Sequence, residues 1–501
     1  MAEETSGGLV PHFSVFIDAG IGDFTKAAAN CICSSHDRDL QIGELQTMWT
    51  TPANRNLVLP LLSVRTGFDL FLRVMNFPPG SEIIMSALNI PDMIQIVRHH
   101  SLRIVPLDIR IETAAPKVDL LPQLVSPRTV AIVIAHLYGK WSPMDEIIAF
   151  AKERNIYVVE DCAECFCGFE RLSHPETDVA LFSFGVIKFY TSFGGAIAKV
   201  RDRELYTKLV ALHETYNMQS SSTYLKKILR YLCMYLVLDV PLIAKTGVKT
   251  LRTFNVDYMY HGVKMLRGFP DQLMQKIRER PSGALLATML HRQKSFSATE
   301  FCLQRLKAEY VAARLPRGLD VVGSKASVNN YWLFPVVTEN PDNLVFLLNA
   351  LGVEAYRGAT QLNVVEPHNG HPNPLLPAHA NNSTTGDKNN SAEQYHSGDS
   401  DTFVMSCAGD CPDPAETDRN DCGNQVDFAK EGTGSPQHIP TVNKQYPHEA
   451  KYLIDHVVYL PVHKLVPFHQ LNRMLRAVKI AVDLHRSSNG PGVKVRFPSK
   501  L

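Results

Sequence analysis

Apolar runs of strand length alternate with stretches of helical spacing through roughly the first 200 residues. Residues 129–137 (TVAIVIAHL) form a continuous, largely β-branched run, which predicts a strand buried on both faces of a sheet. Apolar positions in 143–155 recur at helical spacing behind a proline, which predicts a helix. Further strands are predicted at 82–88, 102–109 and 156–159. This alternation predicts an α/β fold with a mostly parallel central sheet and helices on both faces.

The pattern divides the chain into three parts. An N-terminal segment, 1–62, precedes a large domain predicted to span 63–306. Within that domain, residues 201–306 have a mostly helical pattern. A smaller C-terminal α/β domain combines 307–368 with 448–501.

The stretch 369–447 interrupts the small domain. It is rich in Asn, Ser, Thr, Gly, Asp, Pro and His and contains few apolar residues. Such a composition cannot bury enough area to offset the entropy lost on ordering. The sequence therefore predicts a disordered insertion within the second domain.

Composition narrows the class of protein. With 45% hydrophobic and 20% charged residues, the 501-residue chain has the balance of an ordinary globular protein. The net charge of +1 gives no basic excess for neutralising phosphates, so we expect no nucleic-acid partner. The ten cysteines are irregularly spaced, and the first residues are acidic and small rather than basic and apolar. Free thiols and a cytoplasmic location are expected.

One apolar segment, 231–244 (YLCMYLVLDVPLIA), follows several basic residues. At about 14 residues it is shorter than the roughly 20 needed to span a bilayer. Asp239 and Pro241 also interrupt it. The pattern favours a buried helix or a subunit interface, with contact to a membrane surface as the alternative.

Candidate chemistry falls at predicted element ends. Glu160 and Asp161 close one predicted strand, and the stretch from Ser183 to Lys188 follows another. Residues 63–67 (SVRTG) head a predicted helix. Ligands of open parallel sheets collect outside the carboxyl ends of the strands, so these three features are expected to meet.

Together they fit the needs of a pyridoxal 5′-phosphate (PLP) enzyme. Such an enzyme needs a lysine whose amine can be neutral, a carboxylate beside the pyridine nitrogen, and a phosphate cradle at a helix N terminus. Lys188, Asp161 and the 63–67 turn can fill these roles in that order. Each feature also has an ordinary explanation, because a lysine in a loop is usually solvated and Asp, Ser or Thr at such positions usually caps a helix. Only the order and spacing of the three features together favour a cofactor site.

Several motifs carry a family resemblance. Residues 135–139 (AHLYG), 158–164 (VVEDCAE) and 182–188 (FSFGVIK) resemble segments of the DegT/DnrJ/StrS aminotransferases. Residues 79–84 (PGSEII) and 458–463 (VYLPVH) resemble two of that family's strand segments. The resemblance implies a fold-type-I PLP-dependent transferase, a homodimer, and transfer of an amino group from a donor to a keto or aldehyde acceptor, most often a nucleotide-linked sugar.

The resemblance also implies residue roles. Lys188 is the Schiff-base lysine, Asp161 the partner of the pyridine nitrogen, and Ser183 a phosphate ligand. Glu164 stands near the cofactor ring, where the family usually has Gln or His. Cofactor contacts are further expected from Ser63, Arg65 and Thr66, of which Arg65 resembles a variant subgroup.

Substrate contacts follow by analogy. His136 is expected to line the pocket, and Arg357 to hold a substrate anion. Val64 replaces a glycine common in the phosphate turn, and Ile90 lies near where the family often has an aromatic residue. These departures concern the acceptor substrate more than the cofactor.

Other functions remain open at this level. A PLP enzyme that does not transaminate is one alternative, although sugar dehydratases of this family lack the lysine that this chain has at position 188. A scaffold or regulator derived from the family is the other. Cys162, Cys165 and Cys167 have no second Cys or His pair with suitable spacing, so no metal site is expected.

Overall fold

The computed structural model describes residues 12–32, 37–50, 57–239, 272–358, 362–367 and 446–488. One compact unit comprises Met1–His368 and Thr441–Leu501, and a second comprises Asn369–Pro440. The second unit lies outside the described residues, as does nearly all of the predicted insertion, 369–447.

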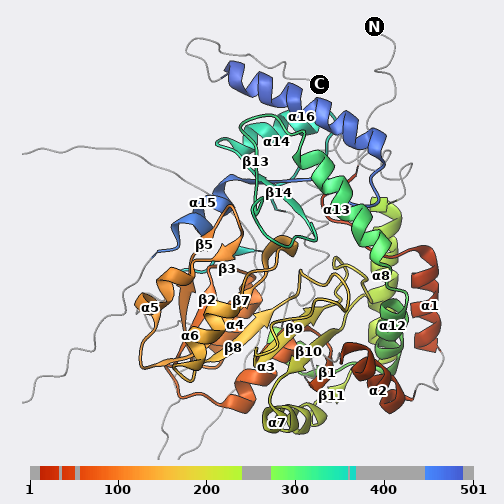
Figure 1. Ribbon diagram of the computed structural model, residues 1–501. Coiled ribbons are helices and arrows are strands. Elements are labelled where there is room, and N and C mark those ends of the chain that lie inside the picture. Colours follow the sequence, from red (N-terminus) through yellow and green to blue (C-terminus); the bar gives the residue numbers. More distant parts are fainter. Residues whose placement is uncertain are drawn as a thin grey trace, which may run out of the picture. The chain divides into compact units, whose positions relative to one another are not determined.

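A seven-stranded sheet forms the centre of the described unit, with strand order β1-β10-β9-β8-β7-β2-β4 (Figure 1). The pairs from β4 to β9 are parallel, whereas β10 runs antiparallel to both β9 and β1. The mostly parallel sheet predicted from the sequence is thereby confirmed. Its strands are β1 (Leu57–Leu61), β2 (Glu82–Ser86), β4 (Arg103–Leu107), β7 (Thr129–Ala135), β8 (Tyr157–Asp161), β9 (Val179–Ser183) and β10 (Ala196–Val200).

Strand β7 illustrates why these segments are strands. Ala131 and Val133 face one hydrophobic core, and Ile132 and Ile134 face another. A strand with apolar side chains on both faces gains burial only when helices cover both sides of the sheet. The continuous apolar run of the sequence reflects this double burial.

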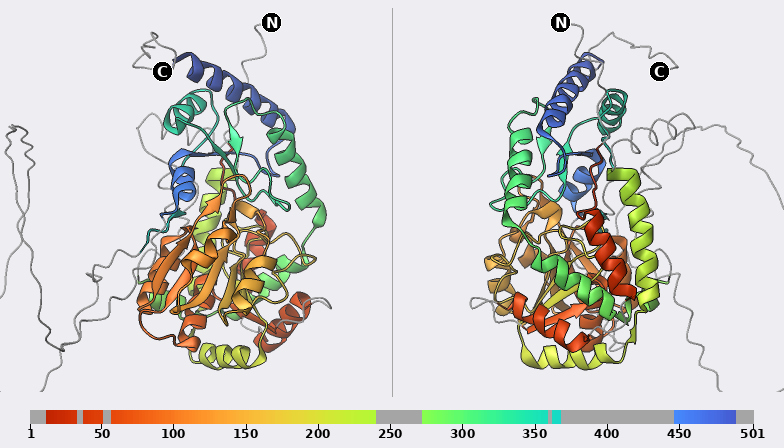
Figure 2. Two further views of the ribbon diagram at one scale, coloured as in Figure 1. Left: turned by 60° about the vertical axis from the view of Figure 1, so that its left-hand side comes forward. Right: turned by 90° about the vertical axis from the view of Figure 1, so that its right-hand side faces the viewer.

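Helices cover both faces of the sheet (Figures 1 and 2). One face packs against α3, α4 and α7, and the other packs against α5 and α6 over β2 and β7 and against α2 and α12 over β9 and β10. The helices of this part are α1 (Ile21–Ile32), α2 (Arg38–Trp49), α3 (Val64–Met75), α4 (Pro91–His99), α5 (Leu121–Leu124), α6 (Asp145–Lys152), α7 (Arg203–Glu214), α8 (Ser221–Asp239), α11 (Leu273–Ile277) and α12 (Gly283–Lys294).

Short elements complete this part of the chain. They are the 3-10 helices η1 (Val118–Leu120) and η2 (Leu137–Gly139), the pair β5 (Ile109–Arg110) and β6 (Ala115–Pro116), the pair β11 (Asn217–Met218) and β12 (Glu279–Arg280), and β3 (Leu88–Asn89), which pairs with β15 (Asn363–Val364).

The N-terminal segment is built into the large domain. Strand β1 forms the edge of the central sheet, paired with β10 some 140 residues later. Helices α1, α8 and α12 lie side by side, as Figure 2 shows. The boundary predicted at residue 62 falls between β1 and α3 and so separates β1 from the domain to which it belongs. The sequence of β1 does not show that its partner is β10, so the strand could not be assigned to the sheet from the sequence.

The small domain has a three-stranded antiparallel sheet covered by helices. Strand β14 lies between β13 and β16, and Phe334 and Val336 of β14 enter the local core. Helix α13 packs there through Ala308 and Val311, although the sequence places most of that helix in the preceding helical block. The elements are α13 (Ala298–Ala312), β13 (Asp320–Val321), β14 (Phe334–Val337), α14 (Pro341–Ala350), α15 (His448–His456), β16 (Val457–Leu460) and α16 (Phe468–Ser488).

Helix α8 contains the described part of the apolar segment 231–244. Tyr231 and Met234 are buried, in line with the predicted buried helix, and residues 240–244 lie outside the described part. Within the described residues, we find no helix whose length and hydropathy would let it cross a membrane.

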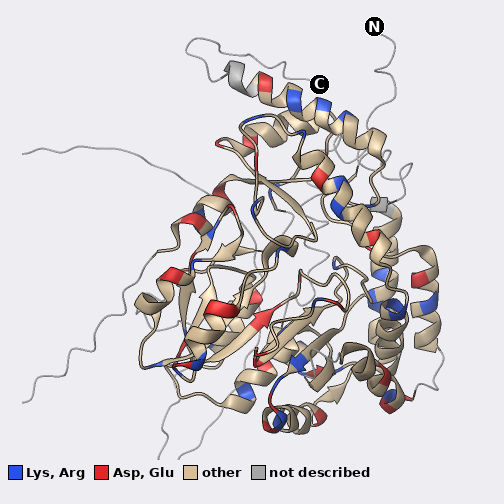
Figure 3. Cartoon of the chain, viewed as in Figure 1, with Lys and Arg blue, Asp and Glu red and all other residues tan. Residues whose placement is uncertain are grey.

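Charged side chains are interspersed over the helices rather than gathered on one element (Figure 3). One charged side chain, Asp69 of α3, is fully buried and forms a cluster with two basic residues. Its carboxylate accepts hydrogen bonds from Arg278 Nε at 2.9 Å and Nη2 at 3.0 Å, and it lies 2.9 Å from His100 Nε2. This cluster ties α3 to α4 and to the segment after α11.

Candidate active site

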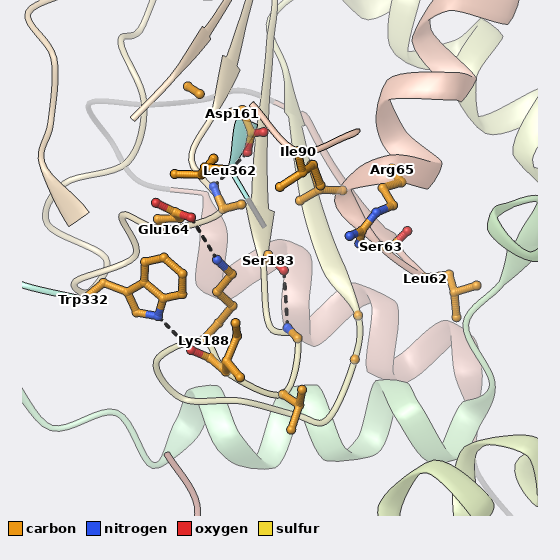
Figure 4. A pocket seen from close by; sticks show the side chains of 18 of the residues that line it. Leu62, Ser63, Arg65, Ile90, Asp161, Glu164, Ser183, Lys188, Trp332 and Leu362 are labelled. Atoms are coloured by element: carbon orange, nitrogen blue, oxygen red, sulfur yellow. Dashed lines mark hydrogen bonds and ion pairs between the residues drawn. The ribbon is translucent and has the colours of Figure 1, made fainter. Parts of the chain in front are cut away.

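A cavity of about 180 Å³ lies at the carboxyl ends of β7, β8 and β9 (Figure 4). Its walls come from the N terminus of α3, the strand ends, the loop after β9, helix α8 and the segment before β14. An apolar cavity of roughly 150 Å³ is enough for benzene, so this one has room for a ring-sized ligand.

The N terminus of α3 forms one wall. Ser63 caps the helix, its Oγ accepting a hydrogen bond from Thr66 N at 3.1 Å. Gly67 allows the helix to approach the sheet, since a Cβ there would lie 2.7 Å from Leu181. Because Ser63 and Arg65 line the cavity, the partial positive charge of the helix terminus borders it.

Asp161 ends β8 and lines the cavity. Its Oδ1 accepts a hydrogen bond from Ala163 N at 3.0 Å. Burial raises the pKa of Asp161, opposed by that bond and by the charges of Lys188, His136 and Arg65. The surrounding groups do not fully offset the cost of burying the negative charge of Asp161. A cationic group bound in the cavity would therefore stabilise the carboxylate.

Lys188 follows β9 and reaches into the same cavity (Figure 4). Its Nζ lies 3.4 Å from Glu164 Oε1 and 3.5 Å from the centre of the Trp332 ring. Burial lowers the pKa of Lys188, while the charges of Glu164 and Asp161 raise it. The net shift brings the amine closer to the neutral form that a nucleophile requires.

Glu164 is oriented by an unusual turn. Its Oε2 accepts a hydrogen bond from Tyr138 N at 2.7 Å, which leaves Oε1 directed at Lys188. Tyr138 has a φ of 55°, in the left-handed region that non-glycine residues seldom adopt. Burial raises the pKa of Glu164, opposed by Lys188 and the Tyr138 bond.

His136 follows β7 and contacts the cavity. Its Nδ1 accepts a hydrogen bond from Ser142 N at 3.1 Å, so the proton of the neutral ring belongs on Nε2. That atom lies 2.8 Å from Glu160 Oε2. Possible ligand atoms of His136, Glu160 and Cys162 lie within 4.8 Å of one another. Both ring nitrogens of His136 already have hydrogen-bond partners, Ser142 N and Glu160 Oε2, so a metal ion would have to displace one of them.

Most of the predicted site residues meet at this cavity. Ser183 lines it, and its Oγ accepts a hydrogen bond from Gly185 N at 3.3 Å. Val64 and Ile90 line it too. The full set of predicted residues at the cavity is Ser63, Arg65, His136, Asp161, Glu164, Ser183 and Lys188.

Two predicted residues lie elsewhere. Thr66 is fully buried behind the cavity wall, where its Oγ1 lies 2.9 Å from Ser63 Oγ and helps to cap α3. Arg357 is not among the residues that line the cavity. Its guanidinium donates to Asp342 Oδ1 at 2.8 Å and to the Asp455 carbonyl at 2.5 Å. Arg357 thus links α14 to α15, and its expected role with a substrate anion stays a prediction.

Several lining residues are not singled out as site residues by the sequence, among them Trp332, Lys227 and Tyr231. Trp332, from the segment before β14, donates through Nε1 to the Ile187 carbonyl at 2.7 Å and places its ring against Lys188. Lys227 and Tyr231 reach the cavity from α8. None of them belongs to a motif, and each is brought in by the packing of a distant segment.

Comparisons with known proteins found a matching family model and similar sequences. Residues 57–232 match the model of the DegT/DnrJ/EryC1/StrS aminotransferase family. The chain is 29% identical over 161 residues to a GDP-perosamine synthase of Escherichia coli O157:H7, covering 31% of this chain and 44% of that protein. A GDP-perosamine synthase of Caulobacter vibrioides is 32% identical over 146 residues, or 29% of this chain and 39% of that protein. The matched segment therefore spans less than half of these relatives.

Solved structures extend the likeness to the whole fold. DesI, determined with its TDP-sugar product, superposes with a TM-score of 0.58 at 16% identity, covering 96% of this chain and 94% of that one. The PMP form of a putative sugar aminotransferase from Streptococcus pneumoniae gives 0.57 at 14% identity, covering 94% and 98%. This likeness shows that the chain shares the fold of these proteins.

Proposed function

We propose that the protein is a PLP-dependent aminotransferase, a proposal supported by the match of residues 57–232 to the model of the DegT/DnrJ/EryC1/StrS aminotransferase family. Its acceptor would be a keto or aldehyde compound, with a nucleotide-linked sugar as the class that the relatives' names suggest. The observation that carries the proposal is that Lys188 and Asp161, from separate strand ends, line one cavity.

The cavity's residues fit PLP in three respects. The buried amine of Lys188 has a lowered pKa, as a covalent attachment point requires. The buried carboxylate of Asp161 has a raised pKa and would gain from a protonated pyridine nitrogen. Ser63, Arg65 and Ser183 offer hydroxyl and cationic groups beside a helix N terminus, where a phosphate is stabilised.

In the reaction, PLP supplies an electron-accepting ring with a reactive carbonyl. Asp161 would hold the ring nitrogen in its protonated form. Lys188 Nζ, when neutral, could take a proton from the substrate carbon that bears the amino group and deliver it to the former carbonyl carbon of the cofactor. Glu164 Oε1, at 3.4 Å from Nζ, is placed to accept a proton from Lys188 or give one back. Trp332 shields Lys188 from water with its ring.

The notable alternative is a PLP enzyme that does not transaminate. One solved neighbour, a GDP-4-keto-6-deoxy-D-mannose-3-dehydratase with bound hydrated PLP, shares the fold with a TM-score of 0.56 at 13% identity. The position of Lys188 in this cavity favours transamination for the present chain, because the amine is available as both attachment point and base.

We further propose a homodimer in the cytoplasm. The homodimer rests on the family resemblance and is tested by light scattering. The cytoplasmic location rests on the sequence expectation alone and is tested by cell fractionation.

A spectroscopic experiment tests the activity. Purified protein is incubated with PLP, and the visible absorbance band of a lysine-bound cofactor is recorded before and after addition of glutamate. We expect a band that bleaches with glutamate and returns with a keto acceptor, and no such band for Lys188→Ala. A wild-type protein that PLP cannot colour would overturn the proposal, and a band insensitive to every amino donor would favour the non-transaminating alternative.

A further inference from the structure

We propose that Lys227 of α8 provides the positive charge of a phosphate-binding subsite at the α3 end of the cavity. The inference rests on the proposed function and deepens it, since it assigns a role to Lys227, which belongs to none of the short motifs that carry the family resemblance. The ligand chemistry is a phosphate ester or a diphosphate, and two sources fit: the cofactor's own phosphate and the diphosphate of a nucleotide-linked substrate.

Helix α8 is fixed to the loop that follows Lys188. Tyr224 is fully buried, and its hydroxyl donates to the Ser192 carbonyl at 2.6 Å. Lys227 comes three residues later and Tyr231 seven residues later, so both lie on the same side of the helix as Tyr224. Both line the cavity. The helix is therefore anchored so that Lys227 borders the cavity.

The same loop is joined to the N terminus of α3. Gly195 N donates to the Leu62 carbonyl at 3.0 Å, directly before the capping residue Ser63. Gly195 has a φ of 85°, and a Cβ there would lie 2.4 Å from Met289 Sδ, so this tight connection requires glycine. The loop thereby brings α8 and the start of α3 to one end of the cavity.

Glu164, which contacts Lys188, lies toward the other end. Figure 4 shows Ser63 and Arg65 on one side, and Lys188 with Glu164 and Trp332 on the opposite side. Glu164 and Asp161 act on Lys188, whereas the charges that act on Lys227 are those of Glu279, Arg230 and Lys276. Lys227 is thus separate from the pair that performs the chemistry.

The electrostatics at Lys227 favour an anion. Burial lowers its pKa, and the like charges of Arg230 and Lys276 lower it further, opposed by Glu279. A phosphate beside the amine would offset both effects. The backbone N–H groups at the start of α3 and the guanidinium of Arg65, already paired with Asp92 at 2.6 Å, add hydrogen-bond donors at this end.

The test compares PLP with pyridoxal, which has the same ring and carbonyl but no phosphate. Full-length wild type, Lys227→Ala, Lys227→Arg and the control Lys226→Ala are titrated with each compound and followed by absorbance. Lys226 is the adjacent lysine of α8 and is exposed. Uridine diphosphate is titrated in parallel. Thermal unfolding of each variant monitors the fold.

We expect Lys227→Ala to weaken PLP binding about tenfold or more, as loss of a charge-assisted contact implies, with pyridoxal binding unchanged. Lys227→Arg should recover most of the affinity, and Lys226→Ala should match wild type. A loss confined to uridine diphosphate would support the subsite and assign it to the substrate.

Equal losses for PLP and pyridoxal, or no loss for any phosphate compound, would overturn the subsite. Failure of the wild type to bind either aldehyde is a different result. It would reject the proposed function, and the uridine diphosphate titration would still decide the role of Lys227.

Discussion

The Nζ atom of Lys188 lies 3.4 Å from Oε1 of Glu164, and both side chains are largely screened from water. At this distance the charge of each group shifts the pKa of the other. Burial lowers the pKa of Lys188 and raises that of Glu164, while their mutual attraction opposes both shifts. The geometry allows a proton to pass between the two groups.

Replacing Glu164 by Gln tests this coupling. The amide can still accept the Tyr138 hydrogen bond but removes the charge that favours the lysine ammonium. The pKa of Lys188 should fall further, so the neutral amine should be present at lower pH. We expect the pH midpoint for attachment of PLP, read by absorbance, to move to lower pH. Glu176→Gln, at a surface position, is the control, and an unchanged or higher midpoint would contradict the coupling.

Asp161→Asn tests the carboxylate. The amide matches the size of the original group but cannot stabilise a protonated pyridine nitrogen, because it lacks the negative charge. We expect PLP still to bind, with the rate of the half-reaction with glutamate lowered about 100-fold or more, as for loss of one preorganised electrostatic group. Stopped-flow absorbance measures that rate. A variant with near wild-type rate would show that Asp161 does not act on the ring.

Asp69 should make stability depend on pH. Burial alone would raise its pKa, but the hydrogen bonds and charges of His100 and Arg278 outweigh burial and hold the pKa below 3.8. The unfolded chain therefore takes up the proton at higher pH than the folded one. The ionised Asp69 therefore stabilises the fold fully above about pH 3.8, the pKa of an ordinary Asp side chain. This stabilisation is lost as the pH falls through the lower pKa that Asp69 has in the folded protein.

Asp69→Asn should accordingly lower the free energy of unfolding by about 3 kcal/mol at neutral pH, since it breaks a buried ion pair. Urea unfolding over a pH series descending to below 3.8 measures the difference from wild type. We expect the difference to shrink as the pH falls. A difference that stays constant or grows would mean that the carboxylate is not the source of the stability.

Removal of residues 369–440 tests the predicted insertion. The stretch has few apolar residues and lies outside the described part of the chain. The deletion retains Glu449, whose Oε2 accepts a hydrogen bond from Ile111 N at 3.0 Å. We expect unchanged PLP absorbance and a melting temperature within a few degrees of wild type. Loss of folded protein would show that the segment supports the domain.

The large domain could be anticipated because its signals are local. The apolar run of β7 lies buried on both faces, and the Ser63 cap begins α3 where the pattern places it. Strand β1 was harder to assign to the sheet, since its partner β10 lies far along the chain. The position of Arg357 away from the cavity could not be read from the sequence for a related reason. Its partner Asp455 lies nearly 100 residues later in the chain, and the sequence around Arg357 does not indicate this contact.

The sequence by itself determined the alternation of strands and helices and set Lys188 and Asp161 at strand ends, because side-chain periodicity and capping are properties of neighbouring residues. Only the tertiary structure decided that Trp332 covers Lys188 and that Lys227 enters the cavity from α8. These contacts join residues that are far apart in the chain, and they are fixed by how whole elements pack.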